Sequence, residues 1–118
     1  MILLALSEGI FQKLKKILDA HKIKYQLIES GEELLEKAKK NKVSLIILEK
    51  DLPLLDGFAV TLLLKSNPKT AHIPIIALCK CNYPEEEIKA KDSGADFIIY
   101  YPFTEEEILN VIREFVKK

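Results

Sequence analysis

The chain has 118 residues, with 18 Lys and Arg against 18 Asp and Glu, so its formal net charge is zero. This length suits one domain over residues 1–118 with one hydrophobic core. A neutral chain with a single arginine, Arg113, argues against nucleic acid as a partner of this domain. Its apolar runs fall far short of the roughly 20 residues of a membrane span, and no basic leader opens the chain, so a cytoplasmic location is expected.

Apolar runs of strand length recur five times along the chain, and each is followed by a segment with helical spacing of apolar residues. Two of the helical segments open on capping-box pairs, Ser30 with Glu33 and Thr104 with Glu107. Five strand-then-helix units therefore account for the whole chain. The predicted strands cover residues 2–6, 23–28, 43–48, 75–78 and 97–100.

The composition of the strands predicts their order in a sheet. The first, third and fourth are apolar almost throughout, as strands are when helices cover both faces of a parallel sheet. The second and fifth carry more polar or hydroxylated residues, which is typical of edge strands. The pattern predicts a flavodoxin-like three-layer α/β/α fold with five parallel strands in the order 2-1-3-4-5. Any functional site should lie at the carboxyl ends of strands one, three and four.

The stretch that follows the third strand contains a spaced motif. Glu49 is followed by Pro53 and then by Asp56-Gly57. Asp56 is suited to cap the next helix, and Gly57 lets that helix begin close against the sheet. Later segments add to the pattern: residues 73–78, 93–96, and the pair Pro102-Phe103.

Taken together, these motifs resemble the receiver domain of bacterial response regulators, the CheY-like superfamily, over essentially the whole chain. The resemblance implies the same flavodoxin-like fold and a cis bond before Pro102. Active members accept a phosphoryl group on an aspartate at the end of strand three. They also use an acidic pair that helps hold Mg²⁺, a hydroxyl after strand four, a lysine before Pro-Phe and an aromatic switch residue in strand five.

The corresponding positions of this chain carry other residues. Glu49 stands at the phosphoacceptor position, and its extra methylene displaces the carboxylate from the place of an aspartate oxygen. The hydroxyl position carries Cys79, a weak hydrogen-bond donor. Leu6 and Ser7 stand at the positions of the acidic pair, and Tyr101 stands at the position of the lysine. Ile98 stands at the position of the switch aromatic. Glu8 and Lys80 also border the pocket.

These departures predict a degenerate pseudo-receiver. Without the acidic pair, Mg²⁺ binding should be lost or weak, because Mg²⁺ prefers carboxylate oxygens. No metal site, other cofactor or enzymatic activity is expected. Cys79 and Cys81 should point to opposite faces of a strand end, so they should neither pair nor share a metal.

Glu49 itself has two non-catalytic interpretations. It stands in for a phosphorylated aspartate and holds the domain in an active-like state, or it is an inherited carboxylate without a role. The first interpretation needs a cationic partner, for which Lys50 and Lys80 are the candidates.

The favoured function is a receiver-like protein-interaction module of two-component (phosphorelay) signal transduction. One rival is a phosphoaccepting response regulator with a rearranged pocket, using Glu49, Asp51 or Ser7. A rival of another class is a small flavodoxin-like cofactor-binding protein, although four glycines leave no phosphate-cradling loop.

The resemblance also implies where a partner docks. In the family, most protein contacts lie on the face of helix four, strand five and helix five. The expected partners are other signalling proteins or an attached output domain, with the chain as a monomer or a weak homodimer through this face. In this chain the face would include Lys89, Lys91, Asp96, Tyr100 and Arg113.

Overall fold

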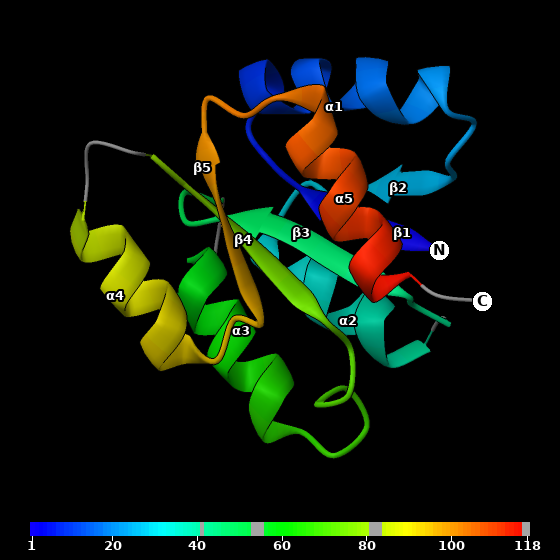
Figure 1. Cartoon of the computed structure of the whole chain (residues 1–118). Helices are drawn as coiled ribbons and strands as arrows, with labels where there is room; N and C mark the ends of the chain where they lie inside the picture. Colours follow the sequence, from blue (N-terminus) through cyan, green and yellow to red (C-terminus); the bar gives the residue numbers. More distant parts are fainter. Residues whose placement is uncertain (41, 53–55, 81–83, 117–118) are drawn as a thin grey trace.

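Strands and helices alternate along the whole chain, as Figure 1 shows for the computed structural model, which describes residues 1–40, 42–52, 56–80 and 84–116. The strands are β1 (Ile2–Ala5), β2 (Tyr25–Leu27), β3 (Leu45–Glu49), β4 (Ile75–Lys80) and β5 (Phe97–Tyr101). The helices are α1 (Glu8–Ala20), α2 (Gly31–Lys40), α3 (Gly57–Ser66), α4 (Pro84–Ser93) and α5 (Glu105–Phe115). None of the helices in these ranges has the length and apolar character needed to cross a bilayer.

The five strands form one parallel sheet in the order β2-β1-β3-β4-β5. The register places Ala5 beside Leu48 and Cys79 beside Tyr100. Strands one, three and four are central and strands two and five are edges, as the composition predicted. The carboxyl ends of β1, β3 and β4 therefore share one end of the sheet.

Helices cover both faces of the sheet, which confirms the three-layer fold (Figure 1). On one face, α1 and α5 bury side chains such as Leu14 and Ile108 against Leu4 and Ile47. On the other, α2, α3 and α4 pack against strand residues of opposite orientation, such as Ile46. Because successive strand side chains alternate between the faces, each central strand serves both cores. Each fully buried Leu or Ile contributes on the order of 2 kcal/mol.

Each of the five strands differs from its predicted bounds by one or two residues at an end: β1 ends at Ala5, β3 covers Leu45–Glu49, β5 ends at Tyr101, and β2 and β4 also change. β2 is shorter than predicted because the backbone N–H of Ile23 donates to Leu18 of α1 instead of to the sheet. β4 is longer, because Cys79 and Lys80 still pair with β5.

The predicted helix caps occur with one change. Thr104 and Glu107 form the reciprocal capping box. Ser30 Oγ accepts from the Glu33 N–H at 3.1 Å, but the Glu33 carboxylate accepts from the Glu29 N–H at 3.1 Å and not from Ser30 itself.

The start of α3 lies directly against the end of β3. Asp56 caps this helix, with its carboxylate 2.7 Å from the Phe58 nitrogen and 3.3 Å from that of Ala59. The Gly57 N–H donates to the Lys50 carbonyl at 2.8 Å. A Cβ at Gly57 would lie 2.0 Å from the Glu49 carbonyl oxygen, far inside van der Waals contact. Only glycine allows this approach, as the sequence predicted.

We expect Gly57→Ala to lower the free energy of unfolding by about 2 kcal/mol or more, since a backbone must move to admit the methyl group. Gly9→Ala is the matched control, because a Cβ there meets nothing within 4 Å. That control should leave stability unchanged or raise it by up to about 1 kcal/mol. Urea unfolding measures both variants, and equal stability of the two would contradict the proposed close approach.

Candidate functional site

Glu49 ends β3 and is almost completely buried, with 6% of its surface exposed. Its Oε1 accepts a hydrogen bond from the backbone N–H of Ser7, 2.5 Å away. Ser7 is the N-cap residue of α1, so the carboxylate lies at the positive end of that helix. The side chain therefore joins the exits of β1 and β3.

This hydrogen bond explains why a carboxylate is tolerated in an apolar surrounding. A buried charge without a partner is costly, whereas a hydrogen bond to a charged group contributes about 1.5 to 3 kcal/mol. Among the residues that the structure describes, no buried side-chain polar atom lacks a hydrogen-bond partner. The partner of Glu49 is thus a backbone amide.

Lys50, one of the two lysines that were candidates for pairing with Glu49, contacts other carboxylates. Lys50 Nζ is 3.8 Å from carboxylate oxygens of both Asp51 and Asp56. The side chain of the second candidate, Lys80, lies outside the described part of the structure, as do Pro53 and Cys81.

Little space remains beside the carboxylate. A cavity of about 10 Å³ adjoins it, close to the minimum that holds one water molecule. The cavity is lined by Ile10, Glu49, Lys50, Asp51, Leu78, Cys79, Glu86 and Tyr101.

The acidic pair that active receivers carry after strand one is absent beside Glu49, although Asp51 and Glu86 line the same cavity. Leu6 lies in the core beneath α1, and Ser7 is exposed. The Glu8 carboxylate accepts a hydrogen bond from Gln12 Nε2 at 2.7 Å on the surface of α1. Within residues 1–40, 42–52, 56–80 and 84–116, no group of three or more His, Cys, Asp and Glu side chains could hold a metal ion.

A model of the response regulator receiver domain matches residues 7–113. The chain belongs to this family. It is 40% identical over 68 residues to a gliding motility regulatory protein of Myxococcus xanthus. The aligned region makes up 58% of this chain and 9% of that protein. The chain spans less than half the length of the curated relatives that it matches.

Solved receiver structures share the fold over nearly the whole chain. The chemotaxis response regulator CheY4 of Vibrio cholerae is 25% identical, with a TM-score of 0.81 over 97% of both chains. The receiver domain of the sensor histidine kinase PA1611 from Pseudomonas aeruginosa is 21% identical, with a TM-score of 0.87 over 98% of this chain and 95% of that one. That structure holds a magnesium ion in its active-site cleft.

Cys79, which the resemblance places at the family's hydroxyl position, carries a buried thiol. Cys79 is 1% exposed and not disulfide-bonded. Burial, aided by the negative charges of Glu86 and Glu87, raises the pKa of the Cys79 thiol to about 11. The thiol therefore stays protonated at neutral pH, which suits neither nucleophilic chemistry nor a firm grip on phosphoryl oxygens.

Tyr101, which the resemblance places at the family's lysine position, lies among aromatic and basic side chains. Tyr101 packs edge-on against Phe103 with ring centroids 5.7 Å apart. Lys13 Nζ lies 5.3 Å from the centre of the Tyr101 ring, in the range of cation–π attraction. At the switch position, Ile98 is half-buried against the core beneath α4.

The residues of the predicted docking face are all exposed, but two are already in ion pairs. Lys91 lies 3.0 Å from Glu87, and the Asp96 carboxylate lies 2.7 Å from Lys65 and accepts from the Ile75 N–H at 2.8 Å. Tyr100 donates to Glu87, and this hydrogen bond raises the pKa of Tyr100 to about 12. Arg113 donates to Asn110 at 3.3 Å.

Sequence reasoning did not single out Glu86 or the apolar residues of the docking face. Glu86 reaches the cavity beside Glu49 because α4 begins close to the end of β4. Ile88 and Phe97 are 60% and 46% exposed on α4 and β5. The signal that could have found Phe97 is its place at the start of a predicted edge strand, where a side chain has neighbours on one side only.

The raised pKa of Cys79 predicts how stability depends on pH. Its ordinary value is 9.0 and its folded value about 11, so the folded chain holds the thiol proton more tightly. The stability that the neutral thiol contributes is fully present below the unfolded pKa and is lost as the pH rises from 9.0 to about 11.

In a Cys81→Ser background, we expect the free energy of unfolding to fall more steeply between about pH 8.5 and pH 10.5 with Cys79 than with Cys79→Ala. Urea unfolding at the two pH values measures the difference in slope. Equal slopes would mean that Cys79 titrates alike in the folded and unfolded chains.

Proposed function

We propose that this receiver domain does not use phosphotransfer and acts as a protein-interaction module in two-component signalling. The observation that carries the proposal is the state of Glu49. Its carboxylate is buried, accepts the Ser7 N–H and has space of about 10 Å³ beside it. A phosphoryl acceptor needs an oxygen that is free to attack, with room in line for the donor.

The surrounding groups support the same conclusion. Charge that develops on a transferred phosphoryl group must be stabilised by cations and firm hydrogen-bond donors. In this chain, the positions that supply them in the family hold an apolar side chain, a protonated thiol and a tyrosine ring, at Leu6, Cys79 and Tyr101.

We infer that Mg²⁺ binding is lost or weak. Of the carboxylates near the rim, Glu49 is held by the Ser7 amide, Glu8 by Gln12, and Asp51 lies 3.8 Å from Lys50 Nζ. Glu86 also lines the cavity, but no group of three such side chains among the described residues could hold a metal ion. Mg²⁺ sheds water reluctantly and needs near-octahedral oxygen ligands, which this set does not offer. The residues present therefore do not fit the family's metal.

The proposal predicts that acetyl phosphate with Mg²⁺ leaves the intact mass of the protein unchanged. A rearranged acceptor is the rival, so peptide mass mapping should follow any adduct. Addition of one phosphoryl group to Glu49, Asp51 or Ser7 would overturn the proposal in favour of a phosphoaccepting regulator.

A variant with restored family residues is the positive control for this experiment. It carries Leu6→Asp, Ser7→Asp, Glu49→Asp, Cys79→Thr and Tyr101→Lys. A phosphoryl adduct on this variant alone would locate the loss of activity in these five side chains.

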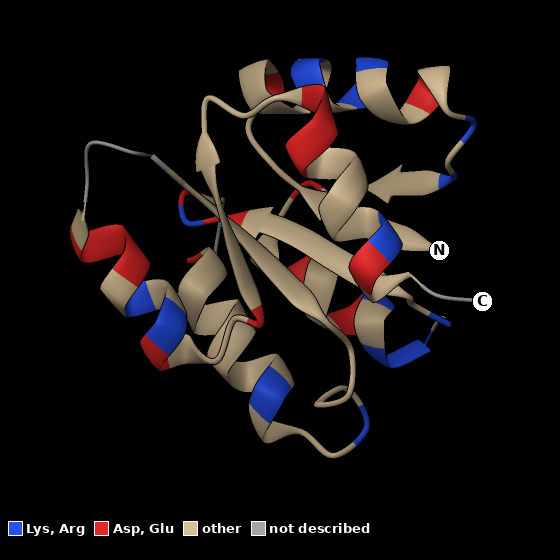
Figure 2. Cartoon of the chain, in the orientation of Figure 1, with Lys and Arg blue, Asp and Glu red and all other residues tan. Residues whose placement is uncertain are grey.

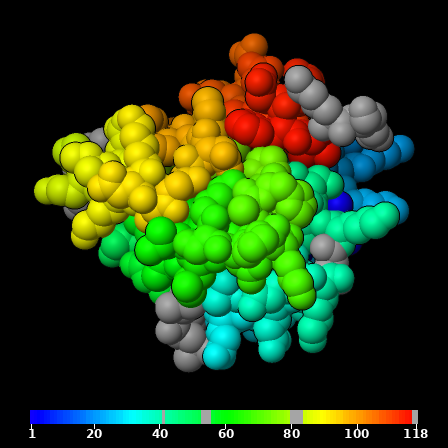
Figure 3. Space-filling model, turned by 90° about the horizontal axis from the view of Figure 1, so that it is seen from below, coloured from blue at the N-terminus to red at the C-terminus, as the bar shows by residue number. Residues whose placement is uncertain are grey.

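The docking face, defined as the exposed surface of α4, β5 and α5, supports an interaction role. These elements run side by side across one surface, from yellow through orange to red in Figure 3. Phe97 and Tyr100 are 46% and 40% exposed on an edge strand, where free backbone groups and aromatic area favour association. Phe97 also packs against Phe115, with ring centroids 6.1 Å apart.

Charges of both signs on the docking face suit a two-fold contact. Figure 2 shows acidic first turns on α4 and α5, with basic residues further along each helix. In a two-fold pair, the basic residues of one copy can meet the acids of the other. Since exposed pairs contribute only about 0 to 1 kcal/mol each, the association should be weak.

We expect sedimentation equilibrium to detect a weak dimer that Tyr100→Ala and Arg113→Glu both dissociate. Lys16→Glu, an exposed change on α1, is the matched control and should leave the dimer intact. Acetyl phosphate should not change the association, because the switch positions hold Cys79 and Ile98. A dimer that ignores both substitutions, one that strengthens with the phosphodonor, or a monomer at all concentrations would contradict this placement.

A further inference from the structure

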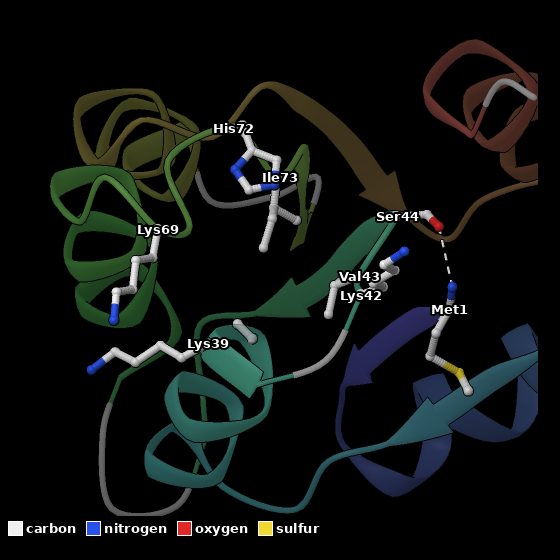
Figure 4. Close-up of a pocket in the computed structure, with 9 residues that line it drawn as sticks. Met1, Lys39, Lys42, Val43, Ser44, Lys69, His72 and Ile73 are labelled. Carbon is white, nitrogen blue, oxygen red and sulfur yellow. Dashed lines mark hydrogen bonds between the residues drawn. The ribbon is translucent and has the colours of Figure 1, made fainter.

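A second hollow lies at the amino end of the sheet, opposite Glu49. It has a volume of about 350 Å³, within the range of small-molecule sites. Its lining comes from segments far apart in sequence: the end of α2, the segment that enters β3, and the loop between α3 and β4. Figure 4 shows these segments around the opening.

The charged side chains at this hollow are all basic or potentially basic. Lys39, Lys42, Lys69 and His72 line it, and no Asp or Glu of the described residues does. In Figure 4, Lys39 and Lys69 extend to the same side of the opening, although one belongs to α2 and the other to the α3–β4 loop. No ion pair joins any of these three lysines to a carboxylate of the described ranges.

The dipole of α2 explains only part of this arrangement. Lys39 lies in the last turn of α2, where positive charge complements the helix carbonyl end. Lys42 and Lys69 lie outside any helix, so the dipole does not account for them. Lys39 and Lys69, which come from different segments, extend to the same side of the hollow (Figure 4). Like charges repel one another, and an anion between these two lysines would relieve that repulsion.

The floor of the hollow is apolar and rigid. Ala38 and Ile73 are 4% and 2% exposed, and they belong to the core beneath α2 and α3. Charges above such a floor are screened less than charges surrounded by water. On the other side, Ser44 offers a hydroxyl, whose oxygen accepts from the Met1 amine at 3.1 Å (dashed in Figure 4).

We propose that this hollow binds a small phosphate-bearing anion, of the size of pyrophosphate or a sugar phosphate. Lysine ammonium groups act as point charges that suit tetrahedral phosphate oxygens approached from several directions. Arginine, whose planar fork matches carboxylates and phosphates alike, does not line the hollow, so the lysines favour an anion by its charge, and a phosphate-bearing anion carries several negative charges. Because the hollow lies at the opposite end of the sheet, anion binding there does not depend on whether Glu49 accepts a phosphoryl group.

The test is an amide-shift titration by NMR with sodium pyrophosphate at constant ionic strength and without divalent metal. We expect saturable shifts that concentrate on residues 38–40, 42–44 and 69–73. The double variant Lys39→Gln/Lys69→Gln should bind roughly tenfold more weakly, because each exposed charge contact is worth up to about fivefold in affinity. An unchanged amide spectrum of this variant without ligand verifies its fold.

The matched control is Lys13→Gln/Lys16→Gln, which removes the same charge from two exposed positions on α1, outside the hollow and the docking face. It should keep the wild-type affinity within about twofold. Four results would each overturn the proposal: shifts that do not saturate or are scattered over all lysines, an equal loss in the control, equal binding of sulfate or malonate, or binding of an oligonucleotide without binding of pyrophosphate.

Discussion

The hydrogen bond between the Ser7 amide and the Glu49 carboxylate is the constraint on which the functional end of this receiver depends. A carboxylate that is 6% exposed must be partnered, and the nearest donor is the backbone at the start of α1. The bond joins the exits of two central strands. It also engages Oε1, one of the two oxygens of the carboxylate, and so supports the proposal that this residue does not accept a phosphoryl group.

The same end of the sheet is tightened by the approach of α3. A Cβ at Gly57 would lie 2.0 Å from the Glu49 carbonyl, so the backbone of Glu49 is held by α3 while its side chain is held by the start of α1. Cys79 and Tyr101 then fill positions where the family has polar or charged groups. The pKa of Cys79 is raised to about 11 because the thiol is buried and the negative charges of Glu86 and Glu87 lie near it.

The two ends of the sheet differ in charge and in openness. At the carboxyl end, about 10 Å³ remains beside a carboxylate. At the amino end, about 350 Å³ is open beneath three lysines and His72. The chain is neutral overall, so this contrast is produced by the placement of its charges and not by their number. The docking face of α4, β5 and α5 lies apart from both ends and combines exposed aromatic rings with paired charges.

The sequence by itself determined the order of elements, the central and edge strands and the family, because strand hydrophobicity, helix caps and the Asp56-Gly57 motif are local patterns. It also identified Glu49, Cys79 and Tyr101 as departures from the family. Only the tertiary structure decided that Glu49 is held by a backbone amide and that Lys50 turns to Asp51 and Asp56. It likewise decided that Lys39, Lys42 and Lys69 meet around one hollow. The reason is physical: backbone donors carry no residue-specific signal, and contacts between distant segments depend on how helices pack across the sheet.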